Sequence, residues 1–87
     1  MAEQGEYRPN FSDLAAELIL SLPRKRQKKV MGCAYELARY PFIGSDYTVV
    51  DADGRAIEHL LIDGFVFSFW VDHAVQLVMI TEIDDAE

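Results

Sequence analysis

A histidine and a serine are predicted to face each other on two neighbouring strands in the second half of the chain. His59 lies in the apolar run before Asp63-Gly64, and Ser68 lies in the run after it. If Asp-Gly forms a two-residue hairpin loop, the two side chains are cross-strand neighbours and can act as a general base and its partner. The sequence supplies no third group to orient the imidazole. The alternative is a hydrogen-bonded pair on a half-buried sheet face.

Other side chains with reactive groups have simpler explanations. Arg55 is a catalytic candidate together with His59 and Ser68, because phosphate chemistry needs cations. Cys33 falls on the apolar face of a predicted helix, where a thiol serves as a small hydrophobic filler. His73 is expected in an exposed turn. One cysteine and two histidines lack zinc-ligand spacing, and neither a calcium loop nor a Gly-rich phosphate loop is present, so we expect no metal and no cofactor.

A basic run at 24–29 is the most concentrated charge in the sequence. It holds five of the eight cations: Arg24, Lys25, Arg26, Lys28 and Lys29. Such a run is commonly the solvated start of a helix. However, cations at a helix N-terminus oppose the helix dipole, which favours a second interpretation. In that interpretation the run contacts a partner, either an acidic protein or a nucleic acid.

Length, composition and charge limit the kinds of protein that this chain can be. With 87 residues and 51% hydrophobic residues, the chain is expected to be one domain, 1–87, with a frayed terminus at 1–6 and an acidic tail at 84–87. A single cysteine excludes an internal disulfide, and no apolar run is long enough for a membrane span, so we expect a cytoplasmic protein. The net charge is +2 in residues 1–40 and −9 in residues 41–87. The acidic half would repel phosphates, which argues against direct nucleic-acid binding by the predicted sheet.

Three β-rich runs between residues 56 and 83, separated by Asp63-Gly64 and Asp72-His73, predict an antiparallel meander. Two-residue loops at both breaks would fix which side chains share a face. One face is predicted to be the core side; it carries Glu58, Leu60, Ile62, Phe65, Phe67, Phe69, Gln76, Val78 and Ile80. The other face carries Ile57, His59, Leu61, Val66, Ser68, Trp70, Val75, Leu77 and Met79. A longer second loop would swap the faces of the last strand.

The second face is nearly as apolar as the first and therefore needs a cover. Helices on both sides of the sheet would provide one. The alternative is an interaction surface for another protein or for a second copy of the chain in a homodimer. Aromatic side chains dominate the energetics of such surfaces, so Trp70 is the main candidate for a partner contact. The predicted contacts around it are Leu61, Val66, Leu77 and Met79.

The first half of the chain predicts two helices. Phe11, Leu14, Ala15, Leu18, Ile19 and Leu22 recur with helical periodicity after a cap at Asn10 or Ser12. Pro23 ends this helix, and a second follows from about residue 24 to residue 39, with Val30, Cys33, Ala34, Leu37 and Ala38 on its apolar face. Residues 7–9 could add a short edge strand, and residues 47–51 predict another strand. We therefore expect an α+β fold, with an N-terminal helical hairpin packed on a four-stranded antiparallel meander.

The order of these elements resembles the RelE/ParE toxin superfamily over residues 7–83. The residues that carry the resemblance are Leu22-Pro23-Arg24-Lys25-Arg26, Tyr40-Pro41, Gly54-Arg55, Asp63-Gly64-Phe65-Val66-Phe67 and Trp70-Val71-Asp72. The resemblance implies the toxin of a bacterial type II toxin–antitoxin module. Such a toxin is held inactive by a cognate antitoxin, whose extended segment wraps it.

Two activities occur in the superfamily that this chain resembles. RelE-like members cleave mRNA on the ribosome with basic residues on the central strands and basic residues or a tyrosine near the C-terminus. ParE-like members inhibit DNA gyrase. Here Leu61 and Val66 stand where arginines are expected, and the chain ends in acids. The pattern therefore favours a ParE-like or catalytically silent member that binds a protein. The alternatives are a non-toxic binding module and, third, a ribosome-dependent mRNA interferase.

Overall fold

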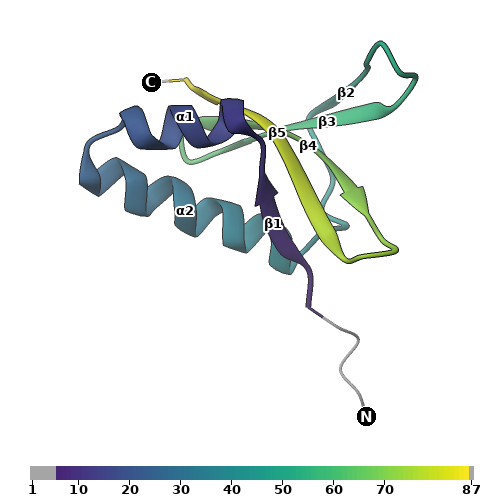
Figure 1. The fold of residues 1–87 in the computed structure, drawn as a ribbon, viewed down its shortest axis with the longest axis horizontal. Helices are drawn as coiled ribbons and strands as arrows, with labels where there is room; N and C mark the ends of the chain where they lie inside the picture. Colours follow the sequence, from purple (N-terminus) through teal and green to yellow (C-terminus); the bar gives the residue numbers. More distant parts are fainter. Residues whose placement is uncertain (1–5, 87) are drawn as a thin grey trace.

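The computed structural model of the chain describes residues 6–86 as one layer of two helices on one twisted sheet (Figure 1). In chain order the elements are β1 (Arg8–Phe11), α1 (Asp13–Ser21), α2 (Arg24–Arg39), β2 (Tyr47–Val50), β3 (Ala56–Ile62), β4 (Phe65–Asp72) and β5 (Leu77–Asp85). The strands lie in the order β1-β5-β4-β3-β2. None of the helices in this range is both long enough and apolar enough to cross a membrane.

The sheet has five strands and is mixed, so the predicted four-stranded antiparallel meander is incomplete. β1 pairs with β5 in parallel, with Arg8 beside Leu77 and Phe11 beside Ile80. The expected edge strand at 7–9 thus begins one residue later and ends at Phe11. Pairing β1 with β5 covers the outer edge of the last strand, a long-range contact that periodicity does not encode. The frayed terminus expected at 1–6 lies outside the described residues except for Glu6.

The central hairpin has the predicted register. Asp63 and Gly64 both have positive φ, at 51° and 87°, as a type I′ turn requires. Ile62 consequently pairs with Phe65, and His59 pairs with Ser68. Local turn chemistry alone therefore fixed which side chains of β3 and β4 share a face.

The β4–β5 connection is longer than predicted. Asp72 pairs with Leu77, so residues 73–76 form the loop, and Gln76 lies in the turn with a φ of 58° instead of in the strand. The faces of β5 are not swapped. Phe69 pairs with Ile80 instead of Gln76, a shift of four residues, and an even shift keeps the side chains from Leu77 to Ile80 on their predicted faces.

A β-bulge interrupts the β4–β5 ladder after Ser68, which pairs with Glu82, while the next residue, Phe69, pairs with Ile80. Thr81 is the extra residue. Its hydroxyl donates to the carbonyl of Ser68, and its own carbonyl accepts a 2.7 Å hydrogen bond from the hydroxyl of Ser12. The bulge thus connects the sheet to the start of α1. Beyond it β5 continues to Asp85, so half of the predicted acidic tail belongs to the strand.

Both helices pack on the phenylalanine face. Ser12 caps α1, since its Oγ accepts a 3.0 Å hydrogen bond from the N–H of Ala15, and α2 begins directly after Pro23. The core joins α1, α2 and the sheet, and its buried members are Ala15, Val30, Cys33, Ala34, Leu37, Ala38, Leu60, Phe65, Phe67, Phe69, Val78, Ile80 and Ile83. The predicted stripe of α1 is wrong at Leu14, which is 55% exposed. Leu14 therefore faces solvent, although the next residue, Ala15, is fully buried in the core.

Candidate functional site

The sheet face opposite the helices brings together the five apolar side chains predicted to meet a partner. We call this set, Leu61, Val66, Trp70, Leu77 and Met79, the open face. Leu61 pairs with Val66 across β3 and β4, and Trp70 pairs with Met79 across β4 and β5. Leu61 is 55% exposed and the other four are partly exposed. No described helix covers the open face, so the alternative of helices on both sides is wrong.

Arg55 lies against the open face. Its guanidinium carbon is 4.1 Å from the centroid of the Trp70 ring, a cation–π contact. The turn before β3 fixes the backbone of Arg55, because Oδ1 of Asp51 accepts hydrogen bonds from the N–H groups of Asp53 and Arg55, each at 2.9 Å. Arg55 therefore covers one side of the indole and places a positive charge beside an otherwise apolar surface.

His59 and Ser68 are cross-strand neighbours as predicted, but no hydrogen bond joins their side chains in the described part of the chain. The His59 ring instead stacks on Tyr47, with 4.5 Å between ring centroids and 7° between the planes. Its Nδ1 is buried and has no hydrogen-bond partner within residues 6–86, and Ser68 is itself buried. The arrangement therefore lacks the orienting group that a catalytic imidazole requires.

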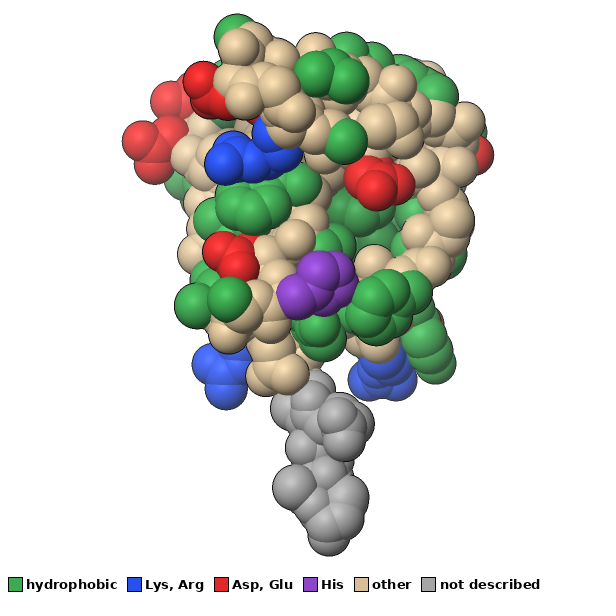
Figure 2. Space-filling model, turned by 90° about the vertical axis from the view of Figure 1, so that its right-hand side faces the viewer, with side chains coloured by type: hydrophobic (Ala, Val, Ile, Leu, Met, Phe, Trp, Pro, Cys, Tyr) green, Lys and Arg blue, Asp and Glu red, His purple; other side chains and the backbone are tan. Residues whose placement is uncertain are grey.

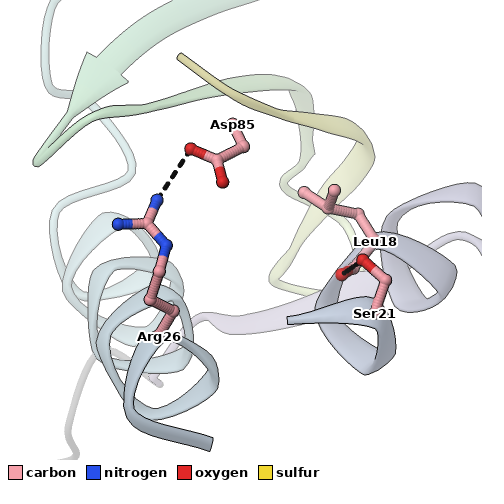
Figure 3. A network of polar contacts seen from close by, with 4 residues as sticks. All are labelled: Leu18, Ser21, Arg26 and Asp85. Atoms are coloured by element: carbon pink, nitrogen blue, oxygen red, sulfur yellow. Dashed lines mark hydrogen bonds and ion pairs between the residues drawn. The ribbon is translucent and has the colours of Figure 1, made fainter. Parts of the chain in front are cut away.

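The basic run lies in the helix layer, on the opposite side of the sheet from the open face. Arg24, Lys25, Lys28 and Lys29 are exposed at the start of α2. Arg26 is used within the molecule. Its guanidinium bonds Oδ1 of Asp85 at 2.7 Å (Figure 3). It also lies 4.6 Å from the centroid of the Phe65 ring. The two predicted partner regions therefore do not form one continuous surface.

An aromatic cluster that the sequence did not reveal joins three distant segments. The hydroxyl of Tyr7 lies 2.8 Å from Nδ1 of His73, and the His73 ring stacks on Phe42 with 5.2 Å between centroids. Tyr7 precedes β1, Phe42 lies between α2 and β2, and His73 lies in the β4–β5 turn. Figure 2, which views this end of the molecule, shows a histidine among hydrophobic side chains. The prediction that His73 is exposed in a turn is confirmed, but its contacts depend on residues far away in the sequence.

A hollow of about 590 Å³ links this cluster to Trp70. The loop after α2, the start of β3 and the end of β4 line it, and among the lining residues are Phe42, Arg55, Glu58, Trp70 and His73. It carries one cation and one acid beside three rings. No group of three or more histidine, cysteine, aspartate or glutamate residues that could hold a metal ion occurs in the described range.

Cys33 lies on the core side of α2, as predicted, with 6% of its surface exposed. Burial raises the pKa of its thiol. Asp63 raises that pKa further, both by its charge and by the hydrogen bond that its Oδ2 accepts from Sγ at 3.6 Å. The charge of Lys29 lowers it. The thiol therefore stays protonated at neutral pH. A nucleophilic cysteine needs the opposite environment.

Comparison with solved structures identifies the fold. The RelBE2 toxin–antitoxin complex of Mycobacterium tuberculosis matches with a TM-score of 0.72 and 17% identity, covering 93% of this chain and 99% of that chain. The RelE–RelB complex of Pyrococcus horikoshii matches with a TM-score of 0.69 and 10% identity, covering 94% of this chain and 97% of that chain. The isolated RelE toxin of E. coli matches with a TM-score of 0.69 and 15% identity, covering 93% of this chain and 85% of that chain.

The chain has the fold of RelE toxins. The resemblance inferred from the sequence is thus confirmed at the level of the RelE-like fold, which these matches share over nearly the whole chain. Scans by sequence against protein-family models and against curated proteins found no match. Two of the three RelE structures are complexes with a partner protein. In the RelE-like fold described here, the open face has no cover.

Proposed function

We propose that this chain is the toxin of a type II toxin–antitoxin pair, that it acts by binding a cellular protein, and that a cognate antitoxin neutralises it. The observation that carries the proposal is the uncovered apolar open face on a RelE-like fold. An exposed apolar patch centred on a tryptophan is typical of a protein interface. The RelE–RelB complexes with the same fold support an antitoxin as one of the partners.

The charges around the open face favour a protein target over RNA. The bulge places Glu82 opposite Ser68, and Asp84 pairs with Val66, so two acids lie on this side of the sheet. Arg8, which pairs with Leu77, and Arg55 are the cations near it. Cleavage of RNA needs cations aimed at the phosphate where negative charge develops. Acids on the same surface oppose that charge, so this arrangement favours the protein-binding mode.

A ParE-like action on DNA gyrase is one form of this proposal. The second candidate is a non-toxic relative that uses the same open face to bind a protein or a second copy of itself. It is favoured by the same uncovered surface, and it differs from the first only in toxicity. The third candidate is an mRNA interferase, which would cleave mRNA on the ribosome.

Expression in bacteria separates these candidates. Inducing the chain alone should arrest growth, and co-expressing the protein encoded beside it should restore growth, while cellular mRNA stays intact. Trp70→Ala should reduce the arrest, whereas Leu20→Ala, an exposed substitution on α1, should not. Growth without arrest would select the non-toxic relative. Arrest accompanied by ribosome-dependent mRNA cleavage would overturn the protein-binding proposal.

A further inference from the structure

The β2 edge of the sheet has no described neighbour. β2 pairs with β3 on one side only, and all four of its residues, Tyr47, Thr48, Val49 and Val50, are exposed. Figure 1 shows the β2–β3 hairpin projecting from the sheet, away from both helices. An exposed edge strand presents unpaired N–H and C=O groups to any extended chain of matching length.

The register shows which backbone groups face outward. Asp51 donates a 2.9 Å hydrogen bond to the carbonyl of Arg55, and Tyr47 lies opposite His59. In an antiparallel pair, residues that bond to the neighbouring strand alternate with residues that do not. Asp51, Val49 and Tyr47 therefore bond to β3. The N–H and C=O groups of Thr48 and Val50 point to the outside.

The side chains of β2 suit strand pairing on both faces. Tyr47 and Val49 lie on the same side of the sheet as His59 and Ile57, and Thr48 and Val50 lie on the other side. Aromatic and β-branched residues are the types that pack well across strands. β2 contains neither a proline nor a lysine, the residues that commonly protect an edge. The other edge strand, β1, contains Pro9.

The charges around this edge indicate the occupant. Asp46, Asp51, Asp53 and Glu58 flank β2 or pair with it, and the nearby cation, Arg55, lies on the ring of Trp70. Two copies pairing through β2 in antiparallel fashion would bring Asp46 of one close to Asp51 of the second. Such like charges oppose self-pairing. A segment with cations at its ends complements the acids.

We propose that β2 binds an extended, cationic segment of a partner protein by strand addition, with the backbone groups of Thr48 and Val50 forming the new hydrogen bonds. The segment lies antiparallel or parallel to β2 and places apolar side chains against Tyr47 and Val49. Its flanking lysines or arginines meet Asp46 and Asp51. Tyr47 and Val49 lie on the same side of the sheet as the open face, but the backbone groups that would bind the segment belong to the β2 edge, and this binding does not depend on toxicity.

The test uses two synthetic peptides in which valine and threonine alternate, one with two lysines at each end and one with two glutamates. Each is titrated into the isotope-labelled chain and followed by NMR. The lysine peptide should shift the amide signals of Thr48 and Val50 and slow their exchange with solvent. The amides of Tyr47 and Val49, already bonded to β3, should keep their exchange rates. The glutamate peptide should not bind, and added salt should weaken the binding of the lysine peptide.

Thr48→Pro removes one outward N–H group and is tolerated on an edge strand. It should lower the affinity for the lysine peptide by about fivefold or more, because one hydrogen bond is lost. Thr48→Ala should change that affinity little. Equal binding of both peptides, or protection of other amides in place of Thr48 and Val50, would overturn the proposal. If the amides of Thr48 and Val50 exchange slowly with solvent at high protein concentration without peptide, the occupant of the β2 edge is a second copy of the chain. That result would overturn the proposal of a cationic segment.

Discussion

Trp70 is the residue on which the open face depends most. The guanidinium of Arg55 lies on its ring, Met79 lies opposite it on β5, and it stands beside the hollow that reaches His73. An aromatic side chain that is half-buried before binding loses little conformational freedom when a partner covers it. This combination is characteristic of residues that contribute most of the free energy of a protein interface.

Replacing Trp70 with alanine is expected to weaken partner binding by about 2 kcal/mol or more. Titration calorimetry with the proposed antitoxin measures the change. Leu20→Ala is the matched control, because Leu20 is an exposed apolar residue on α1, on the other side of the sheet. Leu61→Ala provides a second variant, since Leu61 is already exposed and its loss disturbs the fold little. Unchanged affinity in both open-face variants would remove this face from the interface.

Cys33 gives a prediction about pH. Its pKa in the folded chain is raised above the ordinary value of 9.0, so the thiol's contribution to stability is complete below that value and is lost as pH rises through the folded pKa. The difference in unfolding free energy between the natural chain and Cys33→Ala should therefore shrink between about pH 8 and pH 11. Urea denaturation of both chains across this range measures it. A difference that stays constant would show that the thiol does not titrate differently in the two states.

Among the elements, the β3–β4 hairpin was predictable because its information is local. Asp63-Gly64 fixes the turn, the turn fixes the register, and the register places Phe65 and Phe67 toward the helices. The β4–β5 connection was not predictable in the same way. Asp72-His73 resembles a two-residue loop, yet the strands pair only from Leu77, since the bulge at Thr81 and the contacts of His73 with Tyr7 favour a longer loop.

Gly64→Ala should destabilise the fold by about 1 kcal/mol or more, because a φ of 87° is unfavourable for a residue with a Cβ. Gly44→Ala is the control, since a Cβ at Gly44 meets no atom within 4 Å and its φ is not positive. Chemical denaturation of both variants gives the comparison. Equal stability of the two would contradict a type I′ turn at 63–64.

Gly32 allows a prediction with the opposite sign. It lies inside α2, and a Cβ there meets no atom within 4 Å apart from the helix backbone. Alanine has the higher helix propensity, so Gly32→Ala should raise the free energy of unfolding by about 0.5–1 kcal/mol. The same denaturation series measures it. A loss of stability would indicate that a neighbour packs against Gly32.

For the whole molecule, sequence patterns predicted both helices and the residues of the two sheet faces, because each follows from local periodicity, but they left open whether helices cover the second face. They did not predict the parallel pairing of β1 with β5 or the cluster of Tyr7, Phe42 and His73, since these contacts join residues far apart in the chain. Sequence also grouped Arg24–Lys29 with Trp70 as partner contacts. The layers of the fold separate them, and Arg26 is bonded to Asp85.

The central claim is that a partner protein covers the open face. Its most direct test is NMR of the chain with labelled methyl groups, alone and bound to the proposed antitoxin. The account predicts that the methyl signals of Leu61, Val66, Leu77 and Met79 shift and lose contact with a soluble paramagnetic probe, while that of Leu20 does not. Protection of Leu20 with the four open-face methyl groups left accessible would contradict it.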